Sequence, residues 1–319
     1  SLQESLPTYA GDNARGCESR LFPLAGRKPI YFTCEESVED VMWTTPESCY
    51  QLRETVTYSL HSALQAADVA RSLMPGAADR RPVTAKAALG SVDELKSVAY
   101  RSFMAHLNAL AEDNRLNLYH DNWSKVWEYP WIWFNSLCDL DLQDKKILDI
   151  GSGKSPMPWL FALLGAEVMM VETDCEQLWS PIRQRHQLKI GWRIVSNEGL
   201  PFADNTFDVV TSFSVIEHQP DKASAVAEAA RVLKPGGVFA LSFDLCEPEW
   251  GMRYPKSLGE ALTAKDFEEF VWKHPALDND GQTLDWKLEQ CADFLEWHWG
   301  GNSESKYIVG AAILKKRTR

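Results

Sequence analysis

The chain has 319 residues, 45% of them hydrophobic and 24% charged, with a formal net charge of −12. Such a composition is ordinary for a globular protein and allows one large domain with an accessory region. The acidic balance disfavours DNA or RNA, and no stretch approaches the ~20 consecutive apolar residues that span a bilayer, so we expect neither a nucleic-acid nor a membrane partner.

Residues 1–16 lack the basic start and apolar run of a secretory signal. The seven cysteines are scattered and form no CxxC pair, which is typical of reduced thiols in a cytoplasmic protein. None of the seven histidines forms a close-spaced pair, so no metal site is expected.

Helical spacing of apolar residues dominates the chain before about residue 140. Proline at the first helical position needs no donor, so Thr45 and Pro46 predict the start of a helix that ends near Met74. Ser91 and Glu94 have the spacing of a capping box, and apolar residues follow at helical spacing. We interpret residues 1–120 as a mostly helical accessory region that precedes a domain over residues 121–319.

Residues 121–138 are rich in tryptophan. Aromatic rings bury a large area and also stack on ligands, so composition leaves two interpretations open. The segment is either a helix that packs the accessory region against the rest of the protein or a part of the mouth of a functional site.

After residue 140, short apolar runs alternate with helical segments. Buried strands are predicted at 146–150, 167–172, 192–195, 207–212 and 237–243. Helices are predicted at 156–165 and 221–234, and a last apolar run, 307–314, is expected to be an antiparallel edge strand. The alternation predicts an α/β fold with a Rossmann-like, doubly wound, mostly parallel sheet of seven strands.

The segment Ile147–Pro156 carries the strongest local signal. A buried strand leads into a turn with Gly151 and Gly153 and then into a helix, which is where nucleotides bind in open α/β sheets. Glu172 ends the next strand, where a carboxylate can accept both hydroxyls of a ribose. A dinucleotide site needs a third glycine where Pro156 stands, so NAD and FAD are disfavoured.

Five segments, in order, resemble the motifs of class I S-adenosylmethionine (SAM) dependent methyltransferases: ILDIGSGKSPMP, VMMVETD, LPFADNTFDVV, SVIEHQPD and EAARVLKPGGVFALSF. The resemblance covers roughly residues 125–245 and is similar to the group that contains the ubiquinone and menaquinone biosynthesis methyltransferases. It implies SAM as the cofactor and methyl transfer as the activity.

The resemblance also implies which residues hold the cofactor. The methionine part of SAM is expected beside Asp149, Gly151, Ser152 and Gly153 and, at the end of the fourth strand, Ser212 and Phe213.

The nucleoside part of SAM is expected at the end of the second strand. Glu172 would bind the ribose hydroxyls, and Thr173 would flank the adenine. Glu198 falls in the loop that covers the adenine edge, although many relatives carry an aspartate where this chain has Ser196.

Methyl transfer from a sulfonium is a one-step displacement, so the protein mainly aligns the reactants. An acceptor that must lose a proton needs a base, and two candidates lie at C-terminal strand ends, His218 and Asp244. The acidic residues after Asp244 suit a cationic acceptor. Stacking of a sugar or an ammonium group is expected from a set of tryptophans, Trp250, Trp272, Trp286, Trp297 and Trp299.

We therefore predict N-methylation of a small amine-bearing or amino-sugar-like metabolite. Two alternatives stay open: O-methylation of a phenol, quinone or neutral sugar, and a SAM-binding protein without transferase activity. Residues 1–120 are expected to form a lid or wall over the acceptor pocket.

Overall fold

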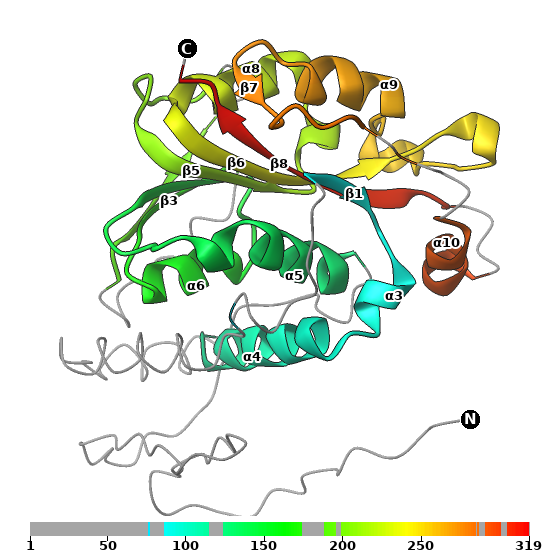
Figure 1. The fold of residues 1–319 in the computed structure, drawn as a ribbon, viewed down its shortest axis with the longest axis horizontal. Coiled ribbons are helices and arrows are strands. Elements are labelled where there is room, and N and C mark those ends of the chain that lie inside the picture. The colour runs from blue at the N-terminus through cyan, green and yellow to red at the C-terminus, as the bar shows by residue number, and fades with distance from the viewer. Residues whose placement is uncertain are drawn as a thin grey trace, which may run out of the picture. The chain divides into compact units, whose positions relative to one another are not determined.

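A computed structural model describes residues 76, 86–114, 124–173, 188–195, 199–284, 286, 291–300 and 305–318 (Figure 1). The chain divides into two compact units, Ser1–Val56 and Thr57–Arg319, and every described residue belongs to the second. The helix predicted between Thr45 and Met74 lies outside the described residues.

Five parallel strands form the centre of the sheet, in the spatial order β6-β5-β2-β3-β4. They are β2 (Lys146–Ile150), β3 (Glu167–Glu172), β4 (Ile190–Ile194), β5 (Phe207–Phe213) and β6 (Leu233–Leu245). Each predicted apolar run overlaps one of them. Neighbouring residues such as Ile147 and Leu148 are both buried although they point to opposite faces, because helices cover the sheet on both sides.

β8 (Ile308–Lys316) pairs antiparallel with β6, as predicted for the last apolar run. It is not the edge strand, because β1 (Ala87–Leu89) and β7 (Leu277–Asp278) pair antiparallel with its other side. Seven strands form the continuous path β1-β8-β6-β5-β2-β3-β4, and β7 lies off it. The predicted seven-stranded, mostly parallel α/β sheet is confirmed, with β1 supplied by the region before residue 120.

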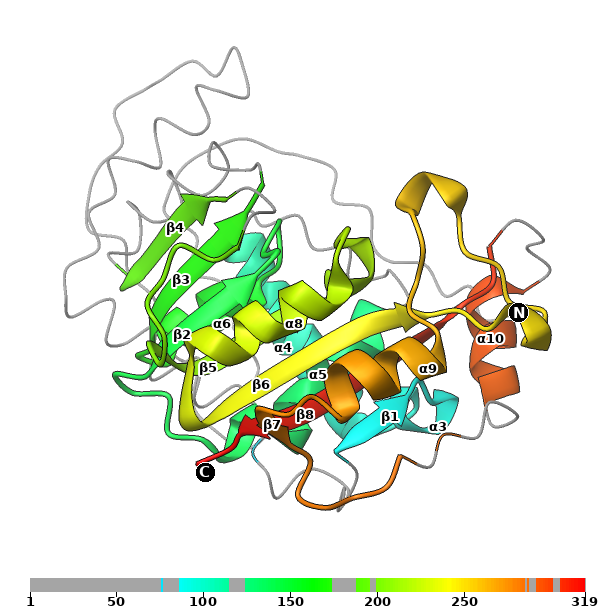
Figure 2. The same cartoon turned by 90° about the horizontal axis from the view of Figure 1, so that it is seen from above.

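Helices lie on both faces of the sheet (Figures 1 and 2). One face carries α4 (Val98–Asn114), α5 (Lys125–Asn135) and α6 (Met157–Leu163), and the other carries α8 (Lys222–Val232) and α9 (Ala264–Phe267). A π-helical turn, Glu268–Trp272, continues α9, while α3 (Val92–Leu95) contacts α10 (Ala292–Trp299). Short 3-10 turns are Leu137–Asp139, Ile216–His218, Pro248–Trp250 and Lys256–Leu258.

The helix predicted from Ser91 onward is two helices, α3 and α4. Ser91 precedes α3, but its side chain makes no capping hydrogen bond, so the predicted capping box is wrong. Glu94 instead accepts a hydrogen bond of 2.6 Å from the indole Nε1 of Trp127. This contact ties α3 to α5.

α5 contains most of the tryptophan-rich segment and packs between α4 and the sheet. Trp127 and Trp131 are fully buried, and their rings stack with centroids 5.7 Å apart. Trp133 stacks on Phe103 of α4 at 5.6 Å. The segment is therefore a packing helix, and the polar residues of the same helix, described below, reach the candidate site as well.

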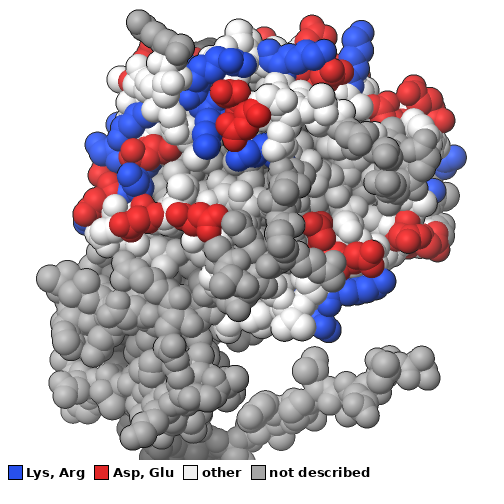
Figure 3. Space-filling view, in the orientation of Figure 1, with Lys and Arg blue, Asp and Glu red and all other residues white. Residues whose placement is uncertain are grey.

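No helix in the described ranges is long and apolar enough to cross a membrane. The same ranges contain no group of three or more His, Cys, Asp or Glu side chains that could hold a metal ion. On the face drawn in Figure 3, acidic and basic side chains lie interspersed.

Candidate active site

The turn after β2 brings backbone atoms to the carboxyl edge of the parallel strands. Gly151 and Gly153 have φ angles of +68° and +45°, in the left-handed region that favours glycine. A Cβ on Gly151 would lie 2.3 Å from a methyl carbon of Val215, so the turn has no room for a side chain there. Ser152 closes the turn by donating from Oγ to the carbonyl of Asp149 at 2.9 Å.

Glu172, the last residue of β3, is held beside this turn. One carboxylate oxygen accepts a hydrogen bond of 3.1 Å from the amide of Gly153, and the other accepts one of 2.9 Å from the amide of Thr173. The order of β2 and β3 in the sheet thus brings together three residues that the sequence assigned to one cofactor.

Asp149, just before the turn, is buried. Its Oδ1 accepts a hydrogen bond of 2.5 Å from the hydroxyl of Thr211 on β5, whereas its Oδ2 has no hydrogen-bond partner among the described residues. Burial raises the pKa of Asp149 to about 7. A cation that reached Oδ2 would favour the ionised carboxylate.

A cavity of about 500 Å³ opens next to these residues, which is within the usual range for a small-molecule site. The predicted cofactor residues that line it are Gly151, Glu172, Thr173 and Ser212. The buried Oγ of Ser212 has no partner in the part of the chain that the structure describes. Sequence reasoning missed the apolar walls, among them Val171, Val195, Leu200, Val215 and Ile216.

Phe213 does not line this cavity. Its side chain packs edge-on against the ring of Tyr129 on α5, with centroids 5.1 Å apart, because successive side chains of a strand point to opposite faces. Glu198 and Ser196 lie outside the described residues.

A second polar cluster, here called the carboxyl cluster, consists of Asp244 at the end of β6 with Glu217 and Tyr254. Both carboxyl groups are buried, with 5% and 1% of each residue exposed. The amide of Asp244 donates to one oxygen of Glu217, and the hydroxyl of Tyr254 donates to Oδ2 of Asp244, each at 3.1 Å. The remaining oxygens, Asp244 Oδ1 and Glu217 Oε2, have no partner within the described ranges.

The carboxyl cluster favours protonated acids in the absence of a ligand. Burial raises the pKa of Asp244 to about 7, and the nearby Glu128 adds to this shift while Lys125 opposes it. Burial and the charge of Asp244 raise the pKa of Glu217 well above its ordinary value. The arrangement can therefore accept a proton or pair with a cation near neutral pH.

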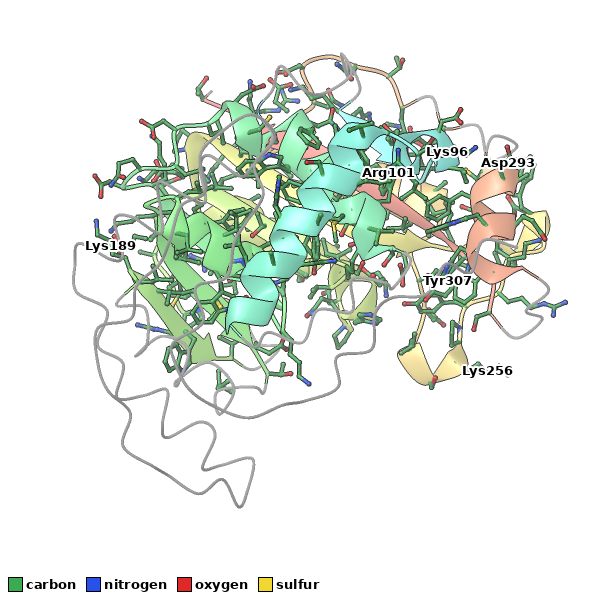
Figure 4. All side chains as sticks on the ribbon, turned by 90° about the horizontal axis from the view of Figure 1, so that it is seen from below. Lys96, Arg101, Lys189, Lys256, Asp293 and Tyr307 are labelled. Atoms are coloured by element: carbon green, nitrogen blue, oxygen red, sulfur yellow. The ribbon has the colours of Figure 1, made fainter. Side chains whose placement is uncertain are left out.

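An aromatic wall stands beside this cluster. The ring of Tyr254 packs edge-on against Tyr307, with centroids 4.7 Å apart. Tyr307 lies near the end of the sheet closest to α10, far from Lys189 at the other end (Figure 4).

The two predicted base candidates have different surroundings. Asp244 belongs to the buried carboxyl cluster, whereas His218 is exposed, with its Nδ1 3.1 Å from the carbonyl oxygen of Leu258. Within the Glu217-His218 pair, the 3-10 turn points the glutamate inward. Sequence reasoning therefore missed Glu217, although it is the neighbour of His218, which was predicted as a base.

A third polar group, the α5 network, links α5 to the ends of β5 and β6. It consists of Lys125, Glu128, Ser214 and Ser242. Glu128 is fully buried and accepts hydrogen bonds from Lys125 at 2.8 Å, Ser242 at 2.5 Å and Ser214 at 3.1 Å. The tryptophan-rich segment therefore also reaches the site, although its sequence did not indicate which polar residues would do so.

The tryptophans predicted to stack on a ligand differ in how exposed they are. Trp250 and Trp297 are each 46% exposed, but Trp272 is buried. Trp272 packs near Phe267 of α9, with ring centroids 6.2 Å apart, so its prediction as an exposed stacking residue is wrong.

Residues 148–241 match a family model described as a methyltransferase domain. The arsenite methyltransferase of Aquipseudomonas alcaligenes is 35% identical over 155 residues, covering 42% of this chain and 44% of that protein. The ubiquinone biosynthesis O-methyltransferase of Paracidovorax citrulli is 35% identical over 111 residues, covering 33% and 45%. The chain thus spans less than half the length of these two relatives.

Among solved structures, a putative sarcosine dimethylglycine methyltransferase from Galdieria sulphuraria is similar with a TM-score of 0.44 and 15% identity, over 72% of this chain and 92% of that one. Together with the motifs, the domain match shows that residues 148–241 form a class I SAM-dependent methyltransferase domain.

The residues around the glycine-rich turn fit the cofactor of this family. SAM presents an ammonium group, a ribose and an adenine. The structure offers an unpartnered buried oxygen of Asp149, the strand-end carboxylate of Glu172 and a cavity with apolar walls.

Proposed function

We propose that this chain transfers a methyl group from SAM to an amine nitrogen of a small, positively charged acceptor. The observation that carries the choice of acceptor is Oδ1 of Asp244, a buried carboxylate oxygen without a partner among the described residues. It lies at the carboxyl end of β6, and β6 pairs with β5, whose Ser212 lines the cofactor cavity.

The cofactor is assigned to the glycine-rich turn. Oδ2 of Asp149 would pair with the ammonium of the methionine part, surrounded by the backbone of Gly151, Ser152 and Gly153. The buried, unpartnered hydroxyl of Ser212 lies on the cavity wall, whereas Asp149, in register with Thr211, does not line the cavity. The methionine part would therefore have to extend from the cavity along the glycine-rich turn to reach Asp149.

The nucleoside part is assigned to the end of β3. Glu172 keeps lone pairs for the ribose hydroxyls beyond its two backbone contacts, and Thr173 lines the cavity where the adenine would lie. Glu198 stays an assignment from the motif alone. SAM bound here supplies a methyl group already activated by its sulfonium.

The charges around the acceptor position favour a cation. Four carboxyl groups near the ends of β5 and β6 are buried, those of Glu128, Glu217, Asp244 and Glu247. Glu128 has its own lysine, Lys125, at 2.8 Å, and Glu247 accepts a hydrogen bond from the amide of Ala264. No basic side chain in the described ranges forms an ion pair with Asp244 or Glu217. A buried carboxylate needs a partner, and an ammonium group between these two would provide it.

The same residues provide the proton transfer that amine methylation needs. An ammonium nitrogen has no free lone pair, so one proton must leave it before it can accept a methyl group. Asp244 is the proposed acceptor of that proton at Oδ1, since its pKa of about 7 suits exchange near neutral pH. Tyr254 fixes the other oxygen of Asp244 and so orients the carboxyl group.

The accessory region is proposed to wall the acceptor pocket. α5 begins at Lys125, shortly after this region, and Lys125 donates a hydrogen bond of 2.8 Å to the hydroxyl of Ser214, which follows β5. This contact supports the proposal, since it holds the start of α5 at the carboxyl edge of the sheet.

A turnover assay with SAM tests the proposal. Primary and secondary amines and aminohexoses are compared with phenols, quinols and neutral sugars, and only the cationic acceptors should be methylated. Asp244→Asn should lower kcat by about a hundredfold or more. Asp293→Asn, at an exposed position on α10 (Figure 4), serves as the matched control and should keep full activity.

Three outcomes separate the alternatives. If only neutral acceptors are methylated, the activity is O-methylation and the proposal of N-methylation is wrong. Binding of S-adenosylhomocysteine without transfer to any acceptor in the screen would favour a non-catalytic protein. Full activity of Asp244→Asn on amines would remove Asp244 from the proton transfer.

A further inference from the structure

Ser214, the residue that follows β5, has a backbone conformation that needs support. Its φ angle is +53°, in the left-handed region that residues with a Cβ rarely adopt. Such conformations persist where the surrounding structure holds them, and they cluster at functional sites. The residue follows β5 at the carboxyl edge of the sheet, two residues after Ser212, which lines the cofactor cavity.

The α5 network holds Ser214 from two sides. Its amide donates to both Oγ and the carbonyl oxygen of Ser242 on β6, each at 3.1 Å. Its hydroxyl accepts a hydrogen bond of 2.8 Å from Lys125 and donates to Glu128 at 3.1 Å. Glu128 also accepts from Ser242, so the network joins one helix and two strand ends around a single residue.

The conformation of Ser214 decides where the next residues lie. Val215 packs its side chain into the space where a Cβ on Gly151 would be, at 2.3 Å and 2.7 Å from its two methyl carbons. Val215 and Ile216 both line the cofactor cavity. A different φ at Ser214 would move this wall away from the glycine-rich turn.

A role in stability alone would be a weak explanation for the network. Removing two charges from water costs about as much as their attraction returns, so a buried ion pair is a poor source of stability. Glu128 and Lys125 lie beside a residue with a left-handed backbone, and this residue precedes a wall of the cavity. Both facts favour a positioning role.

We propose that Glu128, Lys125 and Ser242 are positioning residues that lock Ser214 in its left-handed conformation and thereby fix the wall of the SAM cavity formed by Val215 and Ile216. The inference rests on the proposed function only in taking this cavity to be the SAM site. It does not depend on the identity of the acceptor.

The first test compares two substitutions of Ser214 by calorimetry with S-adenosylhomocysteine. Ser214→Gly and Ser214→Ala both remove the hydroxyl, but only glycine adopts a positive φ without strain. Ser214→Gly should keep the affinity within about threefold, and Ser214→Ala should weaken it about tenfold. Equal losses would mean that the hydroxyl itself is needed, and would overturn the proposal.

The second test asks whether glycine replaces the network. Glu128→Gln should weaken binding of S-adenosylhomocysteine about tenfold in the otherwise native chain, but threefold or less in the Ser214→Gly background. Ser242→Ala should behave in the same way, which covers the case that Glu128→Gln does not fold. Glu269→Gln, an exposed position beyond α9, is the control for loss of a carboxylate. The same loss in both backgrounds would refute the inference.

A readout without ligand separates this inference from the proposed function. Glu128→Gln should increase amide hydrogen exchange at residues 214–216 in the ligand-free protein by about tenfold, and Glu269→Gln should not. Failure of the native chain to bind S-adenosylhomocysteine would remove the proposed function. If amide exchange at residues 214–216 is unchanged in Glu128→Gln, the positioning role is refuted and the proposed function is not affected.

Discussion

Thr211 and Asp149 lie opposite each other on neighbouring strands, and the hydroxyl of Thr211 donates to Oδ1 of Asp149 at 2.5 Å. This bond fixes one oxygen of the carboxyl group and leaves Oδ2 without a partner among the described residues. Two strands that adjoin in the sheet thus present one oriented, buried acceptor just before the glycine-rich turn.

Removing this hydroxyl should make Asp149 harder to ionise. Thr211→Val takes away a hydrogen bond that favours the carboxylate, so the affinity for S-adenosylhomocysteine at pH 7 should fall about tenfold and recover partly at pH 9. Thr211→Ser keeps the hydroxyl and should bind as the native chain does. Calorimetry between pH 6 and pH 9 measures both, and a loss that is equal at every pH would contradict this role.

The stability of the ligand-free protein should fall as the pH rises. The pKa of Asp149 is raised from 3.8 to about 7 by burial, so between these values the folded protein keeps a proton that the unfolded chain has released. The resulting stability, on the order of 4 kcal/mol, is present below pH 4 and is lost as the pH rises through 7. In denaturant titrations, Asp149→Asn should lose less stability than the native chain between pH 4 and pH 8, and parallel curves would show that Asp149 does not cause the change.

Methylation of an amine should depend on the ionisation of Asp244. Because burial raises its pKa to about 7, kcat/KM should increase with pH up to about 7 and then level off, until the free amine titrates. The residual kcat/KM of Asp244→Asn should not show this increase with pH. A profile that follows the pKa of the amine alone, in the native enzyme, would exclude Asp244 as the base.

A methyl group at Gly151 should block the cofactor site. Gly151→Ala places a Cβ 2.3 Å from Val215 at a φ of +68°, so affinity for S-adenosylhomocysteine should fall by well over tenfold. Gly251→Ala is the matched control, since its φ is +73° with nothing within 4 Å of the new Cβ. It should cost about 1–2 kcal/mol of stability without a change in affinity, and equal effects of the two would show that strain alone is responsible.

Arg231 should set the position of the loop after Gly199. It donates to the carbonyl oxygens of Leu200 and Phe202, at 2.9 Å and 2.8 Å, and to the carboxylates of Glu228 and Asp204. Lysine cannot serve all these acceptors, so Arg231→Lys should lower stability by about 1–3 kcal/mol and weaken S-adenosylhomocysteine binding several-fold, because Leu200 lines the cavity.

The exposed pair of Lys189 and Asp144 provides the control for Arg231. Lys189→Gln should change neither thermal unfolding nor binding measurably, since exposed ion pairs contribute little. If Arg231→Lys bound S-adenosylhomocysteine as tightly as the native chain does, the position of the loop after Gly199 would not affect cofactor binding.

The central strands and the glycine-rich turn could be predicted from the sequence for local reasons. β2 and β5 are buried on both faces and therefore appear as continuous apolar runs. Gly151 and Gly153 mark a turn that side chains would forbid. By contrast, β1 has three half-buried residues and β7 has two residues, too few to show any period.

The polar groups of the site were harder to predict because their contacts are distant in sequence. Glu128 meets Ser214 and Ser242 only after α5 has packed on the sheet. Ser214 has a positive φ although it is not glycine, so its residue type does not predict this conformation. Glu217 and His218 are neighbours, and only the direction of a 3-10 turn decides which one enters the cluster.

The pairing of β1 with β8 also constrains the order of assembly. β1 is made before every other described strand, whereas β8 is the last of them to leave the ribosome. β1 therefore has no partner strand until β8 has been made, and the edge of β8 is covered only after a long loop has closed, which is slow. Until then its unpaired amides and carbonyls are open to other chains, so this edge is where aggregation of a half-folded molecule would begin.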